Sequence, residues 1–208
     1  MTHPLFIVFE GIDGCGKSTQ IEKLEQTLIR MGRRVFRTAE PTDGETGLML
    51  RTALAGKTKS SPAEMAALFL LDRIRHNREI TAALERGEDV LCDRYYYSSL
   101  AYQGSLCDFE WVKNMNLGCA EIRRPDLCVF LDIPPFAALA RMNSRAGERE
   151  IYEKEESLTL FREAFFRVFD TLPDPVIRIE ARGTPDAVAE RILETVRPLF
   201  NATDTKEK

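Results

Sequence analysis

The sequence feature that most constrains this chain is a glycine-rich segment close to its N-terminus. Residues 11–18 match the pattern G-x-x-x-x-G-K-[ST]. An apolar run at residues 5–9, typical of a strand, precedes the segment, and Lys17 opens a stretch of helical periodicity. Glycines allow successive backbone N–H groups to turn inward, and the N-terminus of the following helix adds partial positive charge. The pattern therefore predicts a phosphate-binding loop (P-loop), and with it a site for ATP or GTP.

Short apolar runs alternate with helical patterns along the rest of the chain. Ser61, Pro62 and Glu64 have the spacing of a helix start. Strands are predicted at residues 5–9, 34–38, 89–92, 127–131 and 176–179, and helices at 17–31, 46–54, 62–86, 135–142, 157–172 and 185–199. We assign no element to residues 94–126. The alternation predicts an α/β fold of three layers (α/β/α), a P-loop NTPase architecture with a five-stranded parallel sheet.

Length and charge limit the organisation and the partners. The chain has 208 residues and no evident linker or repeat, so we expect one domain over residues 1–208 with a frayed tail at about 201–208. Its 29 basic and 33 acidic residues give a net charge of -4, whereas a protein that coats nucleic acid or an anionic membrane is usually basic. The longest apolar run, residues 65–71, is far shorter than the roughly 20 residues of a membrane span. We therefore expect neither nucleic acid nor membrane as a partner.

Cysteine and histidine usage excludes further classes of site. The five cysteines are an odd number and form no C-x-x-C pair, which favours reduced thiols in a cytoplasmic protein over a disulfide framework. The two histidines, His3 and His76, are far apart in the sequence. A histidine-based metal site or a Ser-His-Asp triad is therefore poorly supported.

Several residues in and after the loop bear on the kind of nucleotide chemistry. The chain has no N-K-x-D segment of the kind that reads the base in GTPases. Lys17 is placed to reach the β- and γ-phosphates, and the Ser18 hydroxyl is placed to bind Mg²⁺. Asp93 and Arg94 follow the third predicted strand, where an aspartate suits a water-mediated Mg²⁺ contact and an arginine projects into the ligand crevice. An ion pair between these two side chains is the alternative.

Three arginines recur in the second half of the chain. Arg141, Arg145 and Arg149 are spaced by four residues, so they share one face if the segment is helical. Two interpretations stay open. The arginines form a solvated face balanced by nearby glutamates, or they belong to a mobile lid, at about residues 142–153, that brings positive charge onto a transferring phosphate.

At this point the chain resembles the thymidylate kinase family, almost from end to end. Residues 9–19 are similar to the family's P-loop with its extra acidic residue, residues 68–73 to its thymine-binding helix, and residues 93–104 to its D-R-[YH] segment, which ends in A-Y-Q-G. The resemblance implies transfer of a phosphate group from ATP-Mg²⁺ to dTMP, which yields ADP and dTDP. It also implies a homodimer.

The resemblance also implies roles for individual residues. Phe69 is expected to stack on thymine, and Arg73, one turn later, to bind a carbonyl of the base. Asp13 is expected to hold the 3′-hydroxyl and Tyr102 to lie under the sugar. The implied substrate-binding set is Asp13, Pro41, Arg51, Phe69, Arg73, Arg94, Ser99, Tyr102 and Gln103. The implied ATP-binding set is Gly11, Ile12, Asp13, Gly14, Cys15, Gly16, Lys17, Ser18 and Thr19. The implied catalytic set is Lys17, Arg94, Arg145 and Arg149, with Ser18 and, through water, Asp93 as metal ligands.

The chain also departs from the family pattern. Ala39 stands where many members begin an R-E-P-G-G motif, so acceptor-phosphate binding is expected to depend more on Arg51 and Arg94. Members with a P-loop arginine carry it where this chain has Gly14, and its absence here fits a catalytic arginine in the lid. Two alternatives stay open: a kinase for another pyrimidine monophosphate such as dUMP, and a P-loop nucleotide-binding protein without transfer chemistry.

Overall fold

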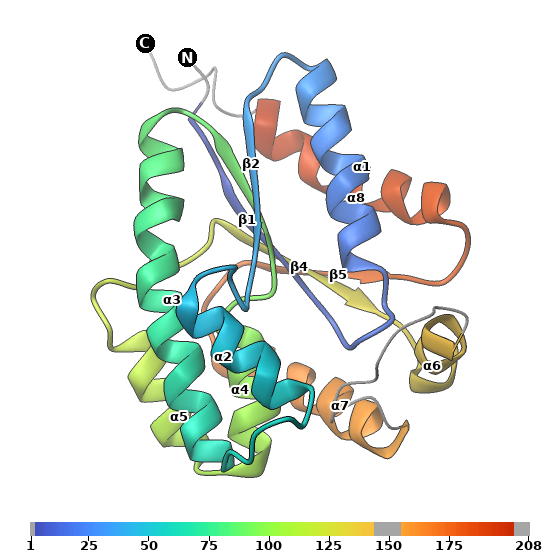
Figure 1. The fold of residues 1–208 in the computed structure, drawn as a ribbon. Coiled ribbons are helices and arrows are strands. Elements are labelled where there is room, and N and C mark those ends of the chain that lie inside the picture. The colour runs from blue at the N-terminus through green and yellow to red at the C-terminus, as the bar shows by residue number, and fades with distance from the viewer. Residues whose placement is uncertain (1–2, 144–154, 202–208) are drawn as a thin grey trace.

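Five parallel strands form one sheet in the order β2-β3-β1-β4-β5 in the computed structural model of the protein (Figure 1). The structure describes residues 3–143 and 155–201. The strands are β1 (Phe6–Glu10), β2 (Val35–Ala39), β3 (Asp89–Asp93), β4 (Leu127–Asp132) and β5 (Val176–Glu180). Every residue of β1 and β4 is buried, as expected for strands covered on both faces. All five predicted strands are confirmed, and no strand boundary differs by more than one residue.

Helices cover both faces of this sheet. They are α1 (Lys17–Arg30), α2 (Glu45–Leu54), α3 (Pro62–Glu85), α4 (Tyr96–Leu106), α5 (Phe109–Leu117), α6 (Pro135–Asn143), α7 (Glu155–Thr171) and α8 (Pro185–Asn201). Helices α1 and α8 pack together on one face, while α3, α4 and α7 lie on the other (Figure 1). Helix α2 packs against α3, and α5 packs against α4. The predicted three-layer α/β/α fold is confirmed.

Two of these helices, α4 and α5, fall in the segment to which the sequence assigned no element. Helix α4 is buried on nearly all sides, with tyrosine, serine and glycine among its buried residues, so its sequence carries no apolar stripe. Helix α5 begins at a recognisable cap, because the Asp108 carboxylate accepts a hydrogen bond of 2.7 Å from the Trp111 amide. That cap is the signal that could have located α5 from the sequence.

Helix α3 is fixed at its start and ties down the loop that follows β2. The predicted capping box is confirmed, since Ser61 and Glu64 each accept a hydrogen bond from the other's backbone amide. Farther along, the buried Asp72 carboxylate accepts hydrogen bonds from the Thr42 amide (2.8 Å) and hydroxyl (2.6 Å) and from the Thr46 hydroxyl (2.7 Å). The loop between β2 and α2 is therefore held against α3.

The predicted lid and tail lie almost entirely outside the described residues. Residues 142 and 143 belong to α6, and Asn201 is the last residue of α8, so the helix extends one residue into the predicted tail. Among the helices described, none is long and apolar enough to cross a bilayer. The polar ends of β1 and β3, at Glu10 and Asp93, meet at the carboxyl edge of the sheet, where parallel α/β folds place their ligands.

Candidate active site

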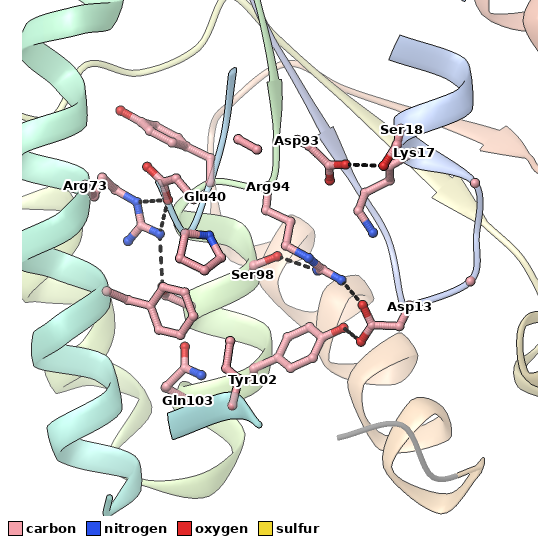
Figure 2. Close-up of a pocket in the computed structure, with 18 of the residues that line it drawn as sticks. Asp13, Lys17, Ser18, Glu40, Arg73, Asp93, Arg94, Ser98, Tyr102 and Gln103 are labelled. Carbon is pink, nitrogen blue, oxygen red and sulfur yellow. Dashed lines mark hydrogen bonds and ion pairs between the residues drawn. The ribbon is translucent and has the colours of Figure 1, made fainter. Parts of the chain in front are cut away.

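A cleft of about 350 Å³ opens at this carboxyl edge. The loop after β1, the end of β2, helix α3, the end of β3 and helix α4 all contribute to its wall (Figure 2). Its lining residues are Asp13, Gly14, Gly16, Lys17, Ser18, Thr19, Ala39, Glu40, Pro41, Leu54, Phe69, Arg73, Asp93, Arg94, Tyr95, Ser98, Ser99, Tyr102 and Gln103. The cleft therefore joins the P-loop to the segments that carry the predicted base-binding residues.

The P-loop has the backbone that its glycines permit. Gly14 and Gly16 have φ angles of +79° and +103°, and a Cβ atom on Gly14 would lie 2.5 Å from the Ala138 carbonyl oxygen. The Lys17 ammonium donates a 3.1 Å hydrogen bond to the Gly11 carbonyl across the loop. Of the predicted ATP-binding residues, Asp13, Gly14, Gly16, Lys17, Ser18 and Thr19 line the cleft, while Gly11, Ile12 and Cys15 do not. Ile12 and Cys15 are buried in the core and support the loop from below.

An oxygen pair lies beside the loop where the sequence predicted metal ligands. The Ser18 hydroxyl donates a 2.9 Å hydrogen bond to the Asp93 carboxylate, which projects from the end of β3 (Figure 2). Hydroxyl and carboxylate oxygens are the donors that Mg²⁺ prefers, and Mg²⁺ keeps several of its waters. The Ser18 hydroxyl and the Asp93 carboxylate thus fit the ligands that a magnesium ion would take beside the loop.

Arg94 occupies the middle of the cleft in an unusual backbone conformation. Its φ of +69° lies in the left-handed region, which is rare for a residue with a Cβ and clusters at functional sites. The guanidinium binds the Asp13 carboxylate, the Ser98 hydroxyl (3.0 Å) and the Gly11 carbonyl (3.3 Å), and it lies 5.3 Å from the centre of the Tyr102 ring. These contacts hold a positive charge between the P-loop and the rest of the cleft.

Asp13 is charged in this setting. Burial alone raises the pKa of the Asp13 carboxyl, but the charges of Arg94 and Lys17 outweigh burial and lower the pKa below 3.8. The Tyr102 hydroxyl donates a 3.3 Å hydrogen bond to the second carboxylate oxygen. The Tyr102 ring in turn stacks on Phe161 of α7 at 4.1 Å.

Glu10 supports Arg94 through Ser98, although the sequence analysis gave this buried carboxylate no role. Ser98 donates a hydrogen bond to Glu10 and accepts one from Arg94. Glu10 at the end of β1 accepts hydrogen bonds from the Tyr95 amide (2.8 Å), the Ser98 amide (3.1 Å) and the Ser98 hydroxyl (2.7 Å). Burial raises the pKa of Glu10 above 4.5, against the opposing charges of Arg94 and Lys17. The signal in the sequence is the acidic residue that ends the apolar run before the P-loop.

The far end of the cleft is built around Arg73, which is almost completely buried. Glu40 accepts two hydrogen bonds from its guanidinium, of 2.9 and 2.6 Å (Figure 2). Ser99 accepts one of 3.1 Å. Asn116 of α5 accepts another. Glu40 also contacts the ring nitrogen Nδ1 of His76 at 3.1 Å. The predicted residues Phe69, Arg73, Ser99 and Gln103 thus meet at one end of the cleft, whereas Glu40 and Asn116 were missed because their partners are distant in sequence.

Several predicted arginines lie elsewhere. Arg51 does not line the cleft but binds the Pro41 carbonyl (2.9 Å) and Asp43 (3.1 Å) in the loop after β2. Arg145 and Arg149 lie outside the described residues. Arg141, the first of the spaced arginines, donates hydrogen bonds to the Cys15 carbonyl (3.1 Å) and to the Ala181 carbonyl (2.8 Å), so it contacts the backbone of the P-loop.

Known proteins resemble this chain over most of its length. The family model for thymidylate kinase matches residues 9–192. A thymidylate kinase of Leptospira borgpetersenii is 38% identical over 200 residues, which cover 95% of this chain and 96% of the relative. A thymidylate kinase of Akkermansia muciniphila is 42% identical and covers 93% of this chain and 92% of the relative, and a probable thymidylate kinase of Thermococcus gammatolerans is 37% identical over 82% and 85%. With the family model matching most of its length and relatives of this identity spanning nearly all of it, this chain belongs to the thymidylate kinase family.

Proposed function

We propose that this protein phosphorylates dTMP to dTDP with ATP and Mg²⁺, the reaction of the family to which it belongs. The observation that carries the proposal is the shape of one continuous cleft. A phosphate-binding loop lies at one end, the buried Arg73 lies at the other, and Arg94 stands between them (Figure 2). That order matches a donor triphosphate, a transferring phosphoryl group and an acceptor base.

The donor nucleotide binds by its phosphates at the P-loop. The loop amides from Gly11 to Thr19 surround the phosphates, and Lys17 exchanges its bond to the Gly11 carbonyl for the β- and γ-phosphates. Ser18 and, through water, Asp93 hold the magnesium ion. When bound, Mg²⁺ neutralises charge that develops on the phosphate oxygens.

The acceptor lies with its base at the Arg73 end and its phosphate beside Arg94. Phe69 stacks on the thymine ring and Arg73 donates to a base carbonyl, with Ser99 and Gln103 along the base edge. In the middle, Asp13 accepts the hydrogen bond of the 3′-hydroxyl, because a charged carboxylate accepts from a hydroxyl but repels a phosphate.

The walls of the acceptor site complete it. Tyr102 lies under the sugar, and Pro41 closes the side of the cleft that faces β2. Arg51 acts indirectly from α2, where it binds the Pro41 carbonyl and Asp43 and so supports the loop after β2 that borders the acceptor site. With Ala39 in place of the arginine found in many family members, Arg94 is the main ligand of that phosphate among the residues described.

Catalysis in this site consists of alignment and charge neutralisation. The second pKa of a phosphate monoester is about 6, so the acceptor is already mostly dianionic at neutral pH and no side chain needs to remove a proton. Two anions must still approach each other. Lys17 and Arg94, joined by Arg145 and Arg149 of the lid, lower the electrostatic repulsion and stabilise the equatorial oxygens of the transferring group.

A panel of monophosphates tests the proposal. ADP release is measured with ATP-Mg²⁺ and dTMP, dUMP, dCMP, dAMP or no acceptor. We expect dTMP to give the highest kcat/KM and the acceptor-free rate to be far lower. Best activity with dCMP or dAMP contradicts the assignment, and rapid ADP release without acceptor supports a P-loop ATPase instead. Homodimer formation, a cytoplasmic location and a single domain over residues 1–208 stay predictions.

A further inference from the structure

The buried side chain of Asn116 contacts the guanidinium of Arg73, which lines the far end of the cleft. Asn116 lies in the last turn of α5 and is 0% exposed. Its carboxamide oxygen accepts a hydrogen bond from Nη1 of Arg73. The two residues are 43 positions apart in the sequence, and α5 reaches Arg73 because it packs against both α3 and α4.

The orientation of the Asn116 carboxamide is fixed by the chemistry of its partners. Its nitrogen donates a 2.8 Å hydrogen bond to the Val112 carbonyl one turn earlier in α5. Arginine has only donors, so the atom that faces Nη1 has to be the oxygen. The opposite orientation would place two donors against each other and leave the Val112 carbonyl without its bond. Asn116 therefore presents a fixed acceptor to Arg73.

Counting donors shows what these contacts leave for a ligand. A guanidinium carries five N–H groups. Glu40 accepts from Nε and Nη2, Ser99 accepts from Nη2, and Asn116 accepts from Nη1. Within residues 3–143 and 155–201, the second N–H of Nη1 is the one with no protein acceptor. The Tyr95 ring lies 5.3 Å from the guanidinium carbon and supports its flat face.

We propose that Asn116 is a positioning residue which, through Arg73, sets the preference of the cleft for a pyrimidine with an oxygen at C4 over one with an amino group there. The inference rests on the proposed function, because it concerns the base of the acceptor. Glu40 fixes one edge of the guanidinium, and Asn116 fixes the nitrogen at its other end. With both edges held, the remaining N–H keeps one direction and Arg73 stays a donor at a fixed place.

A fixed donor discriminates because the two bases differ in what they offer it. A 4-oxo pyrimidine presents an acceptor to Arg73. A 4-amino pyrimidine presents a second donor, and in a buried site both groups then lose hydrogen bonds that water supplied. If Arg73 could turn, it would lower this penalty for the amino base and also bind the oxo base less firmly. Loss of the Asn116 contact is therefore expected to lower kcat/KM for the 4-oxo substrate and to raise it for the 4-amino substrate. The ratio of the two values then falls.

The test compares kcat/KM for dTMP and for 5-methyl-dCMP, which differs from dTMP in the C4 substituent and the N3 proton. For Asn116→Ala we expect the ratio to fall about tenfold, the equivalent of one hydrogen bond to a charged donor. The change should arise mainly in KM, with kcat affected less, because the reacting phosphates are at the other end of the cleft. For Asn116→Asp, which keeps an acceptor at the same place, we expect the ratio to stay close to that of the original protein.

A variant on the same helix separates positioning from packing. Val112→Ala removes two methyl groups from the core one turn away from Asn116 and leaves the Arg73 contacts in place. We expect it to lower the thermal midpoint as Asn116→Ala does while leaving the substrate ratio unchanged. A second probe, 4-thio-dTMP, keeps the N3 proton and replaces the C4 oxygen with a weak sulfur acceptor; its disadvantage against dTMP should also shrink in Asn116→Ala.

Three outcomes overturn the inference: an unchanged ratio in Asn116→Ala, a ratio in Asn116→Asp as low as in Asn116→Ala, or an equal fall in Val112→Ala. If Asn116→Ala does not fold, Asn116→Leu decides between positioning and packing, because leucine fills a similar space but offers Arg73 no acceptor. A lowered ratio in Asn116→Leu supports positioning, and an unchanged ratio overturns it. Failure of the proposed function is a separate result, since the original protein would then show no preferred activity with dTMP.

Discussion

Replacing Arg94 with alanine removes the positive charge from the middle of the cleft. The side chain is 17% exposed and binds Asp13, Ser98 and the Gly11 carbonyl, so its charge is held in place before any ligand arrives. In the proposed reaction the same guanidinium neutralises the acceptor phosphate and the transferring group. The alanine variant keeps the P-loop and the Arg73 end of the cleft intact.

The size of the effect follows from two contributions. An arginine that binds the transferring group in related reactions contributes about 10³–10⁵ in rate. In the proposed site Lys17, together with Arg145 and Arg149, is expected to supply charge as well, so we expect kcat to fall by at least about 10², or ~2.7 kcal/mol. The variant also leaves the Asp13 carboxylate without its guanidinium partner beside the incoming phosphates, and repulsion from a partly buried charge at short range adds to the loss. A second change, Asp13→Asn, removes that repulsion and should restore about tenfold of the lost activity.

Steady-state ADP release with saturating dTMP measures kcat, and calorimetric titration with a non-hydrolysable ATP analogue measures donor binding. We expect donor affinity to change only slightly in Arg94→Ala. Arg33→Ala serves as the matched control, because Arg33 also forms a largely buried ion pair, with Asp89, but at the amino end of the sheet. Near-normal turnover in Arg94→Ala, or an equal loss in Arg33→Ala, would refute the assignment of Arg94.

Three further variants test other parts of the structure. Phe69→Ala should raise KM for dTMP about 5- to 150-fold, the worth of roughly 1–3 kcal/mol for stacking a base on an aromatic ring, with a smaller change in kcat. Gly14→Ala should weaken ATP binding by more than about tenfold, because the new Cβ would lie 2.5 Å from the Ala138 carbonyl at a φ of +79°. Gly32→Ala is the control. Gly32 has a φ of +80° but open space around it, so this variant should leave ATP binding unchanged. Burial raises the pKa of Asp132, but the hydrogen bonds and charges of Arg162 on α7 and Arg178 on β5 outweigh burial and lower this pKa below 3.8. The original protein should therefore resist urea better than Asp132→Asn at neutral pH, and the difference should vanish as the pH falls through that lowered pKa.

The parts of the fold that the sequence predicted are those specified by neighbouring residues. The glycines of residues 11–18 encode the P-loop because only their backbone accepts the φ angles that the loop requires. Ser61 and Glu64 define the start of α3 through bonds across one helical turn. The buried strands are continuous apolar runs bounded by polar residues. Each of these signals lies within a few positions of the structure that it specifies.

Helix α4 is an element that the sequence analysis did not predict. Its sequence combines tyrosine, serine and glycine, which are indifferent or poor helix formers, and burial on nearly all sides removes the periodicity that marks a surface helix. Tertiary packing stabilises it instead: Glu10 accepts two amides and a hydroxyl at its N-terminus, and Tyr96 and Tyr97 both donate to Asp174 beyond α7. The partners are roughly 80 positions away, beyond the reach of any local pattern.

The sequence by itself determined that this chain forms a parallel α/β sheet with a P-loop, and its motifs resemble those of the thymidylate kinase family. The tertiary structure alone decided how the charges are paired within the cleft. Arg94 meets Asp13, and Arg73 meets Glu40 and Asn116, because the ends of β1, β2 and β3 and the packing of α3 against α5 bring these side chains together. Local conformation depends on neighbours in the chain, whereas the direction in which a buried guanidinium donates depends on acceptors that only the folded protein brings within reach.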